Sequence, residues 1–139
     1  MNAVKKLLLI PVFLLLNGCP QPNYVEVFNN TTRDIWILSA TAKSTYIKSG
    51  KTRKLTESQF LYHSMSEDRR FPAVIWISDE IRQWEYDLTA ELLLKVRPRP
   101  DVVTRVQVQS GEEIVILDRG SKYSAYHVPA GLTLHGRRN

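Results

Sequence analysis

The chain has 139 residues, of which 19 are Lys or Arg and 14 are Asp or Glu, so its formal net charge is +5. This length allows one compact domain and is too short for two. This mild positive excess does not indicate the dense basic face typical of nucleic-acid-binding domains, and no nucleic-acid partner is expected.

The first element in the chain is an apolar run from Leu7 to Leu16, which Lys5 and Lys6 precede. A helix that spans a membrane needs about 20 apolar residues to cross about 30 Å of hydrocarbon, so this run is too short. A basic start followed by a short apolar run is typical of an export signal. The sequence therefore predicts that the chain is exported.

The four residues at the end of this run, Leu16-Asn17-Gly18-Cys19, resemble the lipobox of bacterial lipoproteins. Three positions match that pattern, and Asn17 departs from it, because Ala or Ser is more common there. The resemblance implies that residues 1–18 are removed as a signal peptide and that Cys19 becomes the first residue. Cys19 then carries a diacylglycerol thioether and is usually also N-acylated, which gives stable anchoring to a membrane. No cofactor other than this covalent lipid is expected.

Two other fates of the N-terminus are an ordinary cleaved signal and an uncleaved anchor. Ordinary cleavage before Cys19 would place the bulky Leu16 where a small residue is needed. An exported chain with a single cysteine would also keep an unpaired thiol in an oxidising compartment, which lipidation avoids. Pro20, rather than the Asp that resembles an inner-membrane retention signal, follows the cysteine. We therefore expect the outer membrane, with residues 19–23 as a lipidated N-terminus and short tether.

Residues 24–139 form the expected domain, and their pattern is mainly that of strands separated by turns. The first two predicted strands are expected to form a hairpin, and so are the last two. A tight turn at Ser49-Gly50-Lys51 joins the third and the fourth. The predicted strands are Tyr24 to Phe28, Ile35 to Leu38, Ser44 to Lys48, Thr52 to Leu55, Phe71 to Ser78, Arg82 to Leu88, Val102 to Gln109 and Glu113 to Leu117.

Other segments are harder to assign. Thr56 and Gln59 have the spacing of a capping box and predict a short helix within 56–63, although a strand end with a loop fits the same letters. Residues 89–96 fit either a short helix or a strand. Arg97-Pro98-Arg99-Pro100 is a connector or an edge, because proline donates no backbone hydrogen bond. Order beyond Gly120 is difficult to predict, and residues 137–139 are expected to be a frayed tail.

Short strands at this spacing, without a βαβ rhythm, predict a single antiparallel β-sandwich of immunoglobulin-like or transthyretin-like type. At most one or two short helices are expected in it. The nearly unbroken apolar run from Phe71 to Ser78 predicts a central strand that is covered on both faces.

No motif in the chain points to catalysis or to metal binding. The three histidines, His63, His127 and His135, lack the spacing of a zinc site, so no metal is expected. The segment Lys48 to Thr52 lacks the upstream glycine of a phosphate loop. Nucleophile motifs are absent from the sequence, and the adjacent acidic pairs lie in predicted turns, where solvation explains them. We therefore expect no enzymatic activity.

The aromatic and basic residues are more informative. The tryptophans at positions 36, 76 and 84 lie in predicted strands and are expected to fill the core rather than to form a binding platform. A late aromatic segment either forms a recognition surface or folds back over the sheet. A basic segment after residue 94 is either an anion-attracting patch or a solvated loop. The candidates for surface recognition are Lys95, Arg97, Arg99, Tyr123, Tyr126 and His127.

These observations favour a non-enzymatic envelope lipoprotein on the periplasmic face of the outer membrane, with a binding or assembly role and an envelope protein as partner. Two alternatives stay open: an immunity-type or inhibitor lipoprotein against a periplasmic toxin, and an enzyme that acts on a cell-wall or lipid substrate. A buried Asp/Glu/His cluster in a deep pocket would favour the enzyme, and a shallow polar surface with an exposed aromatic loop would favour binding.

Overall fold

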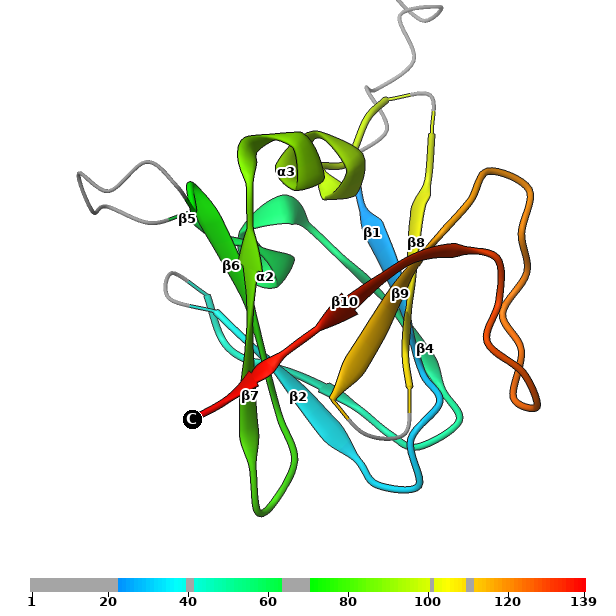
Figure 1. Ribbon diagram of the computed structural model, residues 1–139. Helices are drawn as coiled ribbons and strands as arrows, with labels where there is room; N and C mark the ends of the chain where they lie inside the picture. The colour runs from blue at the N-terminus through cyan, green and yellow to red at the C-terminus, as the bar shows by residue number, and fades with distance from the viewer. Residues whose placement is uncertain (1–22, 40–41, 64–70, 101, 110–111) are drawn as a thin grey trace, which may run out of the picture.

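The computed structural model describes residues 23–39, 42–63, 71–100, 102–109 and 112–139. Within them the chain is mainly β, with two sheets and two short helices around one hydrophobic core (Figure 1). The expected signal peptide, Cys19 and most of the tether lie outside the described residues. In the described ranges, no helix is long and apolar enough to cross a membrane.

Sheet A has five strands, and its central part is built from chain segments that are far apart in the sequence. β1 lies between β4, with which it pairs antiparallel, and β8, with which it pairs parallel. The strand order is β10 (Gly131–His135), β9 (Glu113–Leu117), β8 (Thr104–Val108), β1 (Val25–Asn29) and β4 (Thr52–Leu55).

Sheet B contains the other six strands. Its centre is β6, which was expected there from its apolar sequence and which lies between β7 and β2. The order is β11 (Arg137–Arg138), β7 (Gln83–Leu88), β6 (Ala73–Ser78), β2 (Ile35–Leu38) and β3 (Thr45–Ile47), and β5 (Tyr62–His63) also pairs with β6.

The expected pairing was partly wrong. β8 and β9 form the predicted hairpin, but β1 and β2 do not pair, because β1 belongs to sheet A and β2 to sheet B. The β1–β8 pair is parallel, whereas a fully antiparallel arrangement was expected. β1 and β8 are far apart in the sequence, so no short turn forces them to run antiparallel. A parallel pair needs a long crossover between its two strands, and the chain that forms sheet B supplies it.

Short connections join the two sheets at both edges. At one edge β3 passes into β4 through a turn in which Gly50 has a φ of 70°, a conformation that glycine adopts without strain. At the other edge β10 passes into β11 through Gly136 alone. The C-terminal segment is therefore ordered as a strand in each sheet, and the expectation of a frayed tail was wrong. Its pairing with β9 and β7 is a long-range feature that the local sequence pattern does not reveal.

The core lies between the sheets and receives alternate residues of their strands. In β1, Val25 and Val27 are fully buried, and in β2 so is Ile37. Trp84 is the only tryptophan of the core among the described residues, because Trp36 and Trp76 are half-buried on the opposite face of their strands. The expectation that all three fill the core was therefore wrong for two of them.

Both ambiguous segments contain a helix. α2 (Glu57–Phe60) begins after Thr56, whose backbone N–H donates to Gln59 Oε1 at 2.9 Å, as a capping box requires. α3 (Ala90–Val96) begins after Thr89, whose Oγ1 accepts from the backbone N–H of Leu92 at 3.3 Å. Each helix buries one residue at its C-terminal end, Phe60 and Val96, against the core.

Candidate functional site

The three basic candidates lie at the C-terminal end of α3 and in the segment that follows it. Each of them is held by a separate partner rather than pooled in one patch. Lys95 Nζ lies 3.4 Å from Glu91 Oε1, and Arg97 Nε lies 3.1 Å from Glu57 Oε1. Arg99 Nη2 donates to the backbone carbonyl of Leu94 at 3.0 Å, which caps the end of the helix.

A groove of about 260 Å³ lies beside this segment, and Lys95 contributes to its lining. Two more cations reach it from sheet A, Arg105 at the start of β8 and Arg119 just after β9. Arg105 Nε lies 3.6 Å from Glu26 Oε1. The groove therefore joins basic side chains that are distant in sequence, and sequence reasoning identified only the first of them.

The aromatic candidates lie in the loop that joins β9 to β10, residues 118–130, which runs along the side of sheet A (Figure 1, orange to red). The base of this loop is attached to the sheet. The buried Gln107 donates through Nε2 to the carbonyl of Ser124 at 2.6 Å and accepts from the Ser124 N–H at 2.9 Å. Tyr123 donates to the carbonyl of Glu26 at 2.9 Å. These bonds fix the loop against β8 and β1.

Tyr123 folds back over the sheet, as one of the two expectations for this segment had it. Its ring centroid lies 5.2 Å from that of Phe28, in a tilted arrangement. Burial raises the pKa of the Tyr123 hydroxyl, and the nearby Glu26 raises it further. Tyr123 is therefore a neutral anchor and not an exposed recognition residue.

The tip of the loop is exposed, as the other expectation had it. Tyr126 is 99% exposed and Val128 58% exposed. His127 is also exposed, and its Nδ1 lies 2.9 Å from Ser124 Oγ. That oxygen accepts from the backbone N–H groups of Tyr126 and His127, each at 3.3 Å, so the contact belongs to a turn. In the described part of the chain no carboxylate contacts His127, so the pair lacks the orienting group of a catalytic triad.

Sequence reasoning missed an aromatic face on the outer side of sheet B. Trp76 stacks on Tyr62 with ring centroids 4.5 Å apart, and Trp36 lies 5.3 Å from Tyr46. The signal was present in the sequence, because each of these tryptophans stands between two isoleucines. Since strand side chains alternate between faces, buried isoleucines on both sides direct the tryptophan outward.

A carboxylate pair on the same face has divergent pKa values. Burial alone would raise the pKa of both Glu85 and Asp87. For Glu85 this effect is outweighed by hydrogen bonds from Asn139 and Trp76 and by the charge of Arg137, so its pKa is lowered. For Asp87 burial prevails and the pKa is raised.

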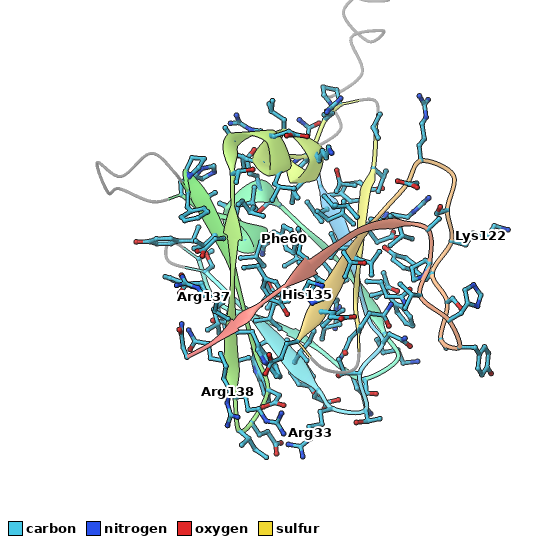
Figure 2. The ribbon with its side chains drawn as sticks, viewed as in Figure 1. Arg33, Phe60, Lys122, His135, Arg137 and Arg138 are labelled. Carbon is cyan, nitrogen blue, oxygen red and sulfur yellow. The ribbon has the colours of Figure 1, made fainter. Side chains whose placement is uncertain are left out.

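This pair binds the C-terminal strand of the chain itself. Arg137 Nη2 lies 2.9 Å from Glu85 Oε1 and 3.0 Å from Asp87 Oδ2, and Figure 2 shows Arg137 in the strand beside β7. The divergent pKa values therefore arise in an exposed ion-pair cluster in which Arg137 of the same chain binds both carboxylates. This cluster holds the C-terminal strand and is not the two-carboxylate cleft that acid-base catalysis needs.

A smaller pocket of about 160 Å³ lies at the opposite end of the molecule from α3, between the β1–β2 and β6–β7 loops. Asp79 Oδ1 accepts from the N–H groups of Ile81 and Arg82, each at 2.7 Å, and Arg33 Nη1 lies 4.0 Å from Oδ2. Burial raises the pKa of Asp79, but these donors and cations outweigh it, so the pKa is lowered. The carboxylate of Asp79 thus stabilises the β6–β7 loop.

The described residues hold no group of three or more His, Cys, Asp or Glu side chains that could bind a metal ion. Comparison of the chain with protein-family models, with curated proteins and with solved structures gave no match.

Proposed function

We propose that this chain is a bacterial envelope lipoprotein, anchored through lipid on Cys19 to the periplasmic face of the outer membrane. Its domain is a non-enzymatic binding or assembly module that recognises another envelope protein. In this proposal the two sheets form a β-sandwich of immunoglobulin-like or transthyretin-like type. The short connections that join the sheets at both edges agree with such an arrangement.

One observation carries the binding role, the attachment of the β9–β10 loop. Its base is held by the two hydrogen bonds between Gln107 and Ser124, while Tyr126 at its tip is almost fully exposed. A fixed loop loses little conformational entropy when it binds, and tyrosine supplies a large contact area with few rotatable bonds. An exposed aromatic ring on a pre-ordered loop is therefore suited to recognition of a protein surface.

Three carboxylates with shifted pKa values, Glu85, Asp87 and Asp79, give no support to the enzyme alternative. Glu85 and Asp87 bind Arg137, and Asp79 binds its own loop. All three lie outside the groove beside α3, whose lining contains Asp118 as its only carboxylate within the described residues. Catalysis by paired carboxylates needs two of them at one cleft, on either side of the reacting bond.

Anchoring is tested by intact-mass measurement of the protein from its native host. We expect a chain that begins at Cys19 and carries the mass of a diacylglycerol group, usually with an additional acyl chain. A Cys19→Ser variant is the control, because it cannot form the thioether. An unmodified Cys19 that is still joined to Gly18 would overturn the anchoring proposal.

Binding is tested by a photo-crosslinking amino acid at Tyr126, followed by mass spectrometry of the captured protein from native membranes. Lys43, exposed in the β2–β3 connection, is the matched control position. We expect one envelope protein to be captured from position 126 and not from position 43. Capture of a toxin would support the immunity alternative instead, and equal capture from both positions would contradict recognition by the loop.

A further inference from the structure

We infer that the end of the domain that carries α3 lies directly on an anionic phospholipid surface. This inference rests on the proposed lipidation of Cys19. We call this end, which contains the groove and the first residues of β1, the anchor end. It is defined by five exposed residues: Leu94, Lys95, Arg99, Val103 and Arg119.

The first reason is the length of the tether. Asn23 is the first described residue, and only Pro20, Gln21 and Pro22 separate it from Cys19. Consecutive Cα atoms are 3.8 Å apart, so Cys19 and Asn23 are at most about 15 Å apart. Any acyl chains on Cys19 are in the bilayer, and the start of β1 is therefore close to the headgroups.

The second reason is what surrounds the start of β1. Val25 pairs with Thr104 at the start of β8 and with Leu55 at the end of β4. In Figure 1, α3 lies at the same end of the molecule as the first residues of β1 and β8. The short tether therefore brings the anchor end, and not another surface, against the membrane.

The third reason is the charge of this end. Lys95, Arg97 and Arg105 are paired with Glu91, Glu57 and Glu26. Lys54, Arg99 and Arg119 have no ion pair with any described carboxylate, and Asp118 is the one further carboxylate of the groove in the described chain. Among the described side chains of this end the excess is positive, and basic side chains within a Debye length of anionic lipid are attracted to it.

The fourth reason is the apolar surface. Leu94 is 63% exposed and Val103 39% exposed, and both lie next to these cations. Exposed apolar residues beside lysine and arginine are suited to the interface between headgroups and acyl chains. The contact would fix the orientation of the domain, so that the β1–β2 and β6–β7 loops, with Arg33, face away from the membrane (Figure 2).

The test uses lipidated protein whose acylation has been confirmed by mass. A single cysteine is introduced for a fluorophore at Leu94 or at Ile81, because Cys19 is blocked by lipid. The two positions are matched, since Leu94 is 63% and Ile81 65% exposed, and Ile81 lies in the β6–β7 loop at the other end. Each labelled protein is reconstituted into phosphatidylcholine vesicles that contain quencher-labelled lipid, with and without phosphatidylglycerol.

We expect stronger quenching at position 94 than at position 81, an increase with phosphatidylglycerol, and a loss of that increase at high salt. The triple variant Lys95→Glu, Arg99→Glu and Arg119→Glu should also lose it. A control variant with the same charge change, Lys48→Glu, Lys51→Glu and Arg82→Glu, should keep it. Lys48 and Lys51 lie in the turn that bonds to Asn29 at the other end of β1, and Arg82 lies in the β6–β7 loop. Equal quenching at both positions, or no response to phosphatidylglycerol, would overturn the orientation alone. Absence of lipid on Cys19 would overturn the proposed function and this inference together.

Discussion

Gly136 lies directly against the ring of Tyr86: a Cβ at position 136 would be 2.8 Å from Tyr86 Cζ and 3.1 Å from Trp84 Cβ. At this residue the chain leaves sheet A, where β10 pairs with β9, and enters sheet B, where β11 pairs with β7. The Gly136 N–H also donates to the carbonyl of Glu112 at 2.8 Å. The crossing between the sheets therefore requires a residue without a side chain.

Gly136→Ala should destabilise the protein by about 1–3 kcal/mol, the usual cost of forcing extra atoms into a packed site. The free energy of unfolding from urea denaturation measures this effect. Much of the penalty should disappear in a Tyr86→Leu background, because the clashing ring atoms are then absent. An equal penalty in both backgrounds would show that the contact with Tyr86 is not its cause.

The strands with clean apolar patterns could be predicted from the sequence, because burial on one face imposes alternation. In β6 the isoleucines on both sides of Trp76 are buried, and the capping-box spacing of Thr56 and Gln59 predicted α2, whereas residues 89–96 fitted either a helix or a strand. Which strands pair could not be predicted, because the parallel β1–β8 pair and the crossing at Gly136 depend on contacts between distant segments.

The sequence predicted which types of residue form the candidate surface, but not which partners they have or which of them are exposed. The run that contains Lys95 and Arg97 was visible as a basic segment, but their partners Glu91 and Glu57 appear only when the helices are placed. Likewise the sequence shows an aromatic segment at the C-terminal end. That Tyr123 is an anchor while Tyr126 is exposed depends on the distant Gln107 and Glu26.

Gln107→Ala should release the β9–β10 loop, because the fully buried Gln107 makes two hydrogen bonds to Ser124. We expect a loss of about 1–3 kcal/mol in the free energy of unfolding and faster amide hydrogen exchange in residues 121–128. Tyr126→Ala is the matched control: its side chain is 99% exposed, so both stability and amide exchange should be unchanged. Unchanged amide exchange in the Gln107 variant would contradict the role of Gln107 in attaching the loop to sheet A.

Arg137→Ala should loosen the C-terminal strand, because its guanidinium group contacts both Glu85 and Asp87. The side chain of Arg137 is 68% exposed, so global stability should fall by no more than about 1 kcal/mol. Amide exchange in residues 137–139 should be faster, and the pKa of Glu85, measured by NMR titration, should rise. Arg138→Ala is the control, because Arg138 makes no ion pair within the described residues. Equal effects of the two variants would contradict the role of the Arg137 ion pairs in holding the C-terminal strand.

Asp34 should make stability depend on acid pH. The hydrogen bond from the Tyr46 hydroxyl, followed by that from the Ser49 N–H at 2.8 Å, holds the pKa of Asp34 below its usual 3.8. A carboxyl group whose pKa is lowered by folding binds fewer protons in the folded state, so its stabilisation is complete above pH 3.8 and is lost as the pH falls through the folded pKa. Thermal unfolding followed between neutral and strongly acidic pH should therefore show a smaller acid-induced decrease in Tm for Asp34→Asn. Tyr46→Phe should give an intermediate decrease, because the bond from Ser49 remains. A wild-type acid response in both variants would show that Asp34 contributes nothing to it.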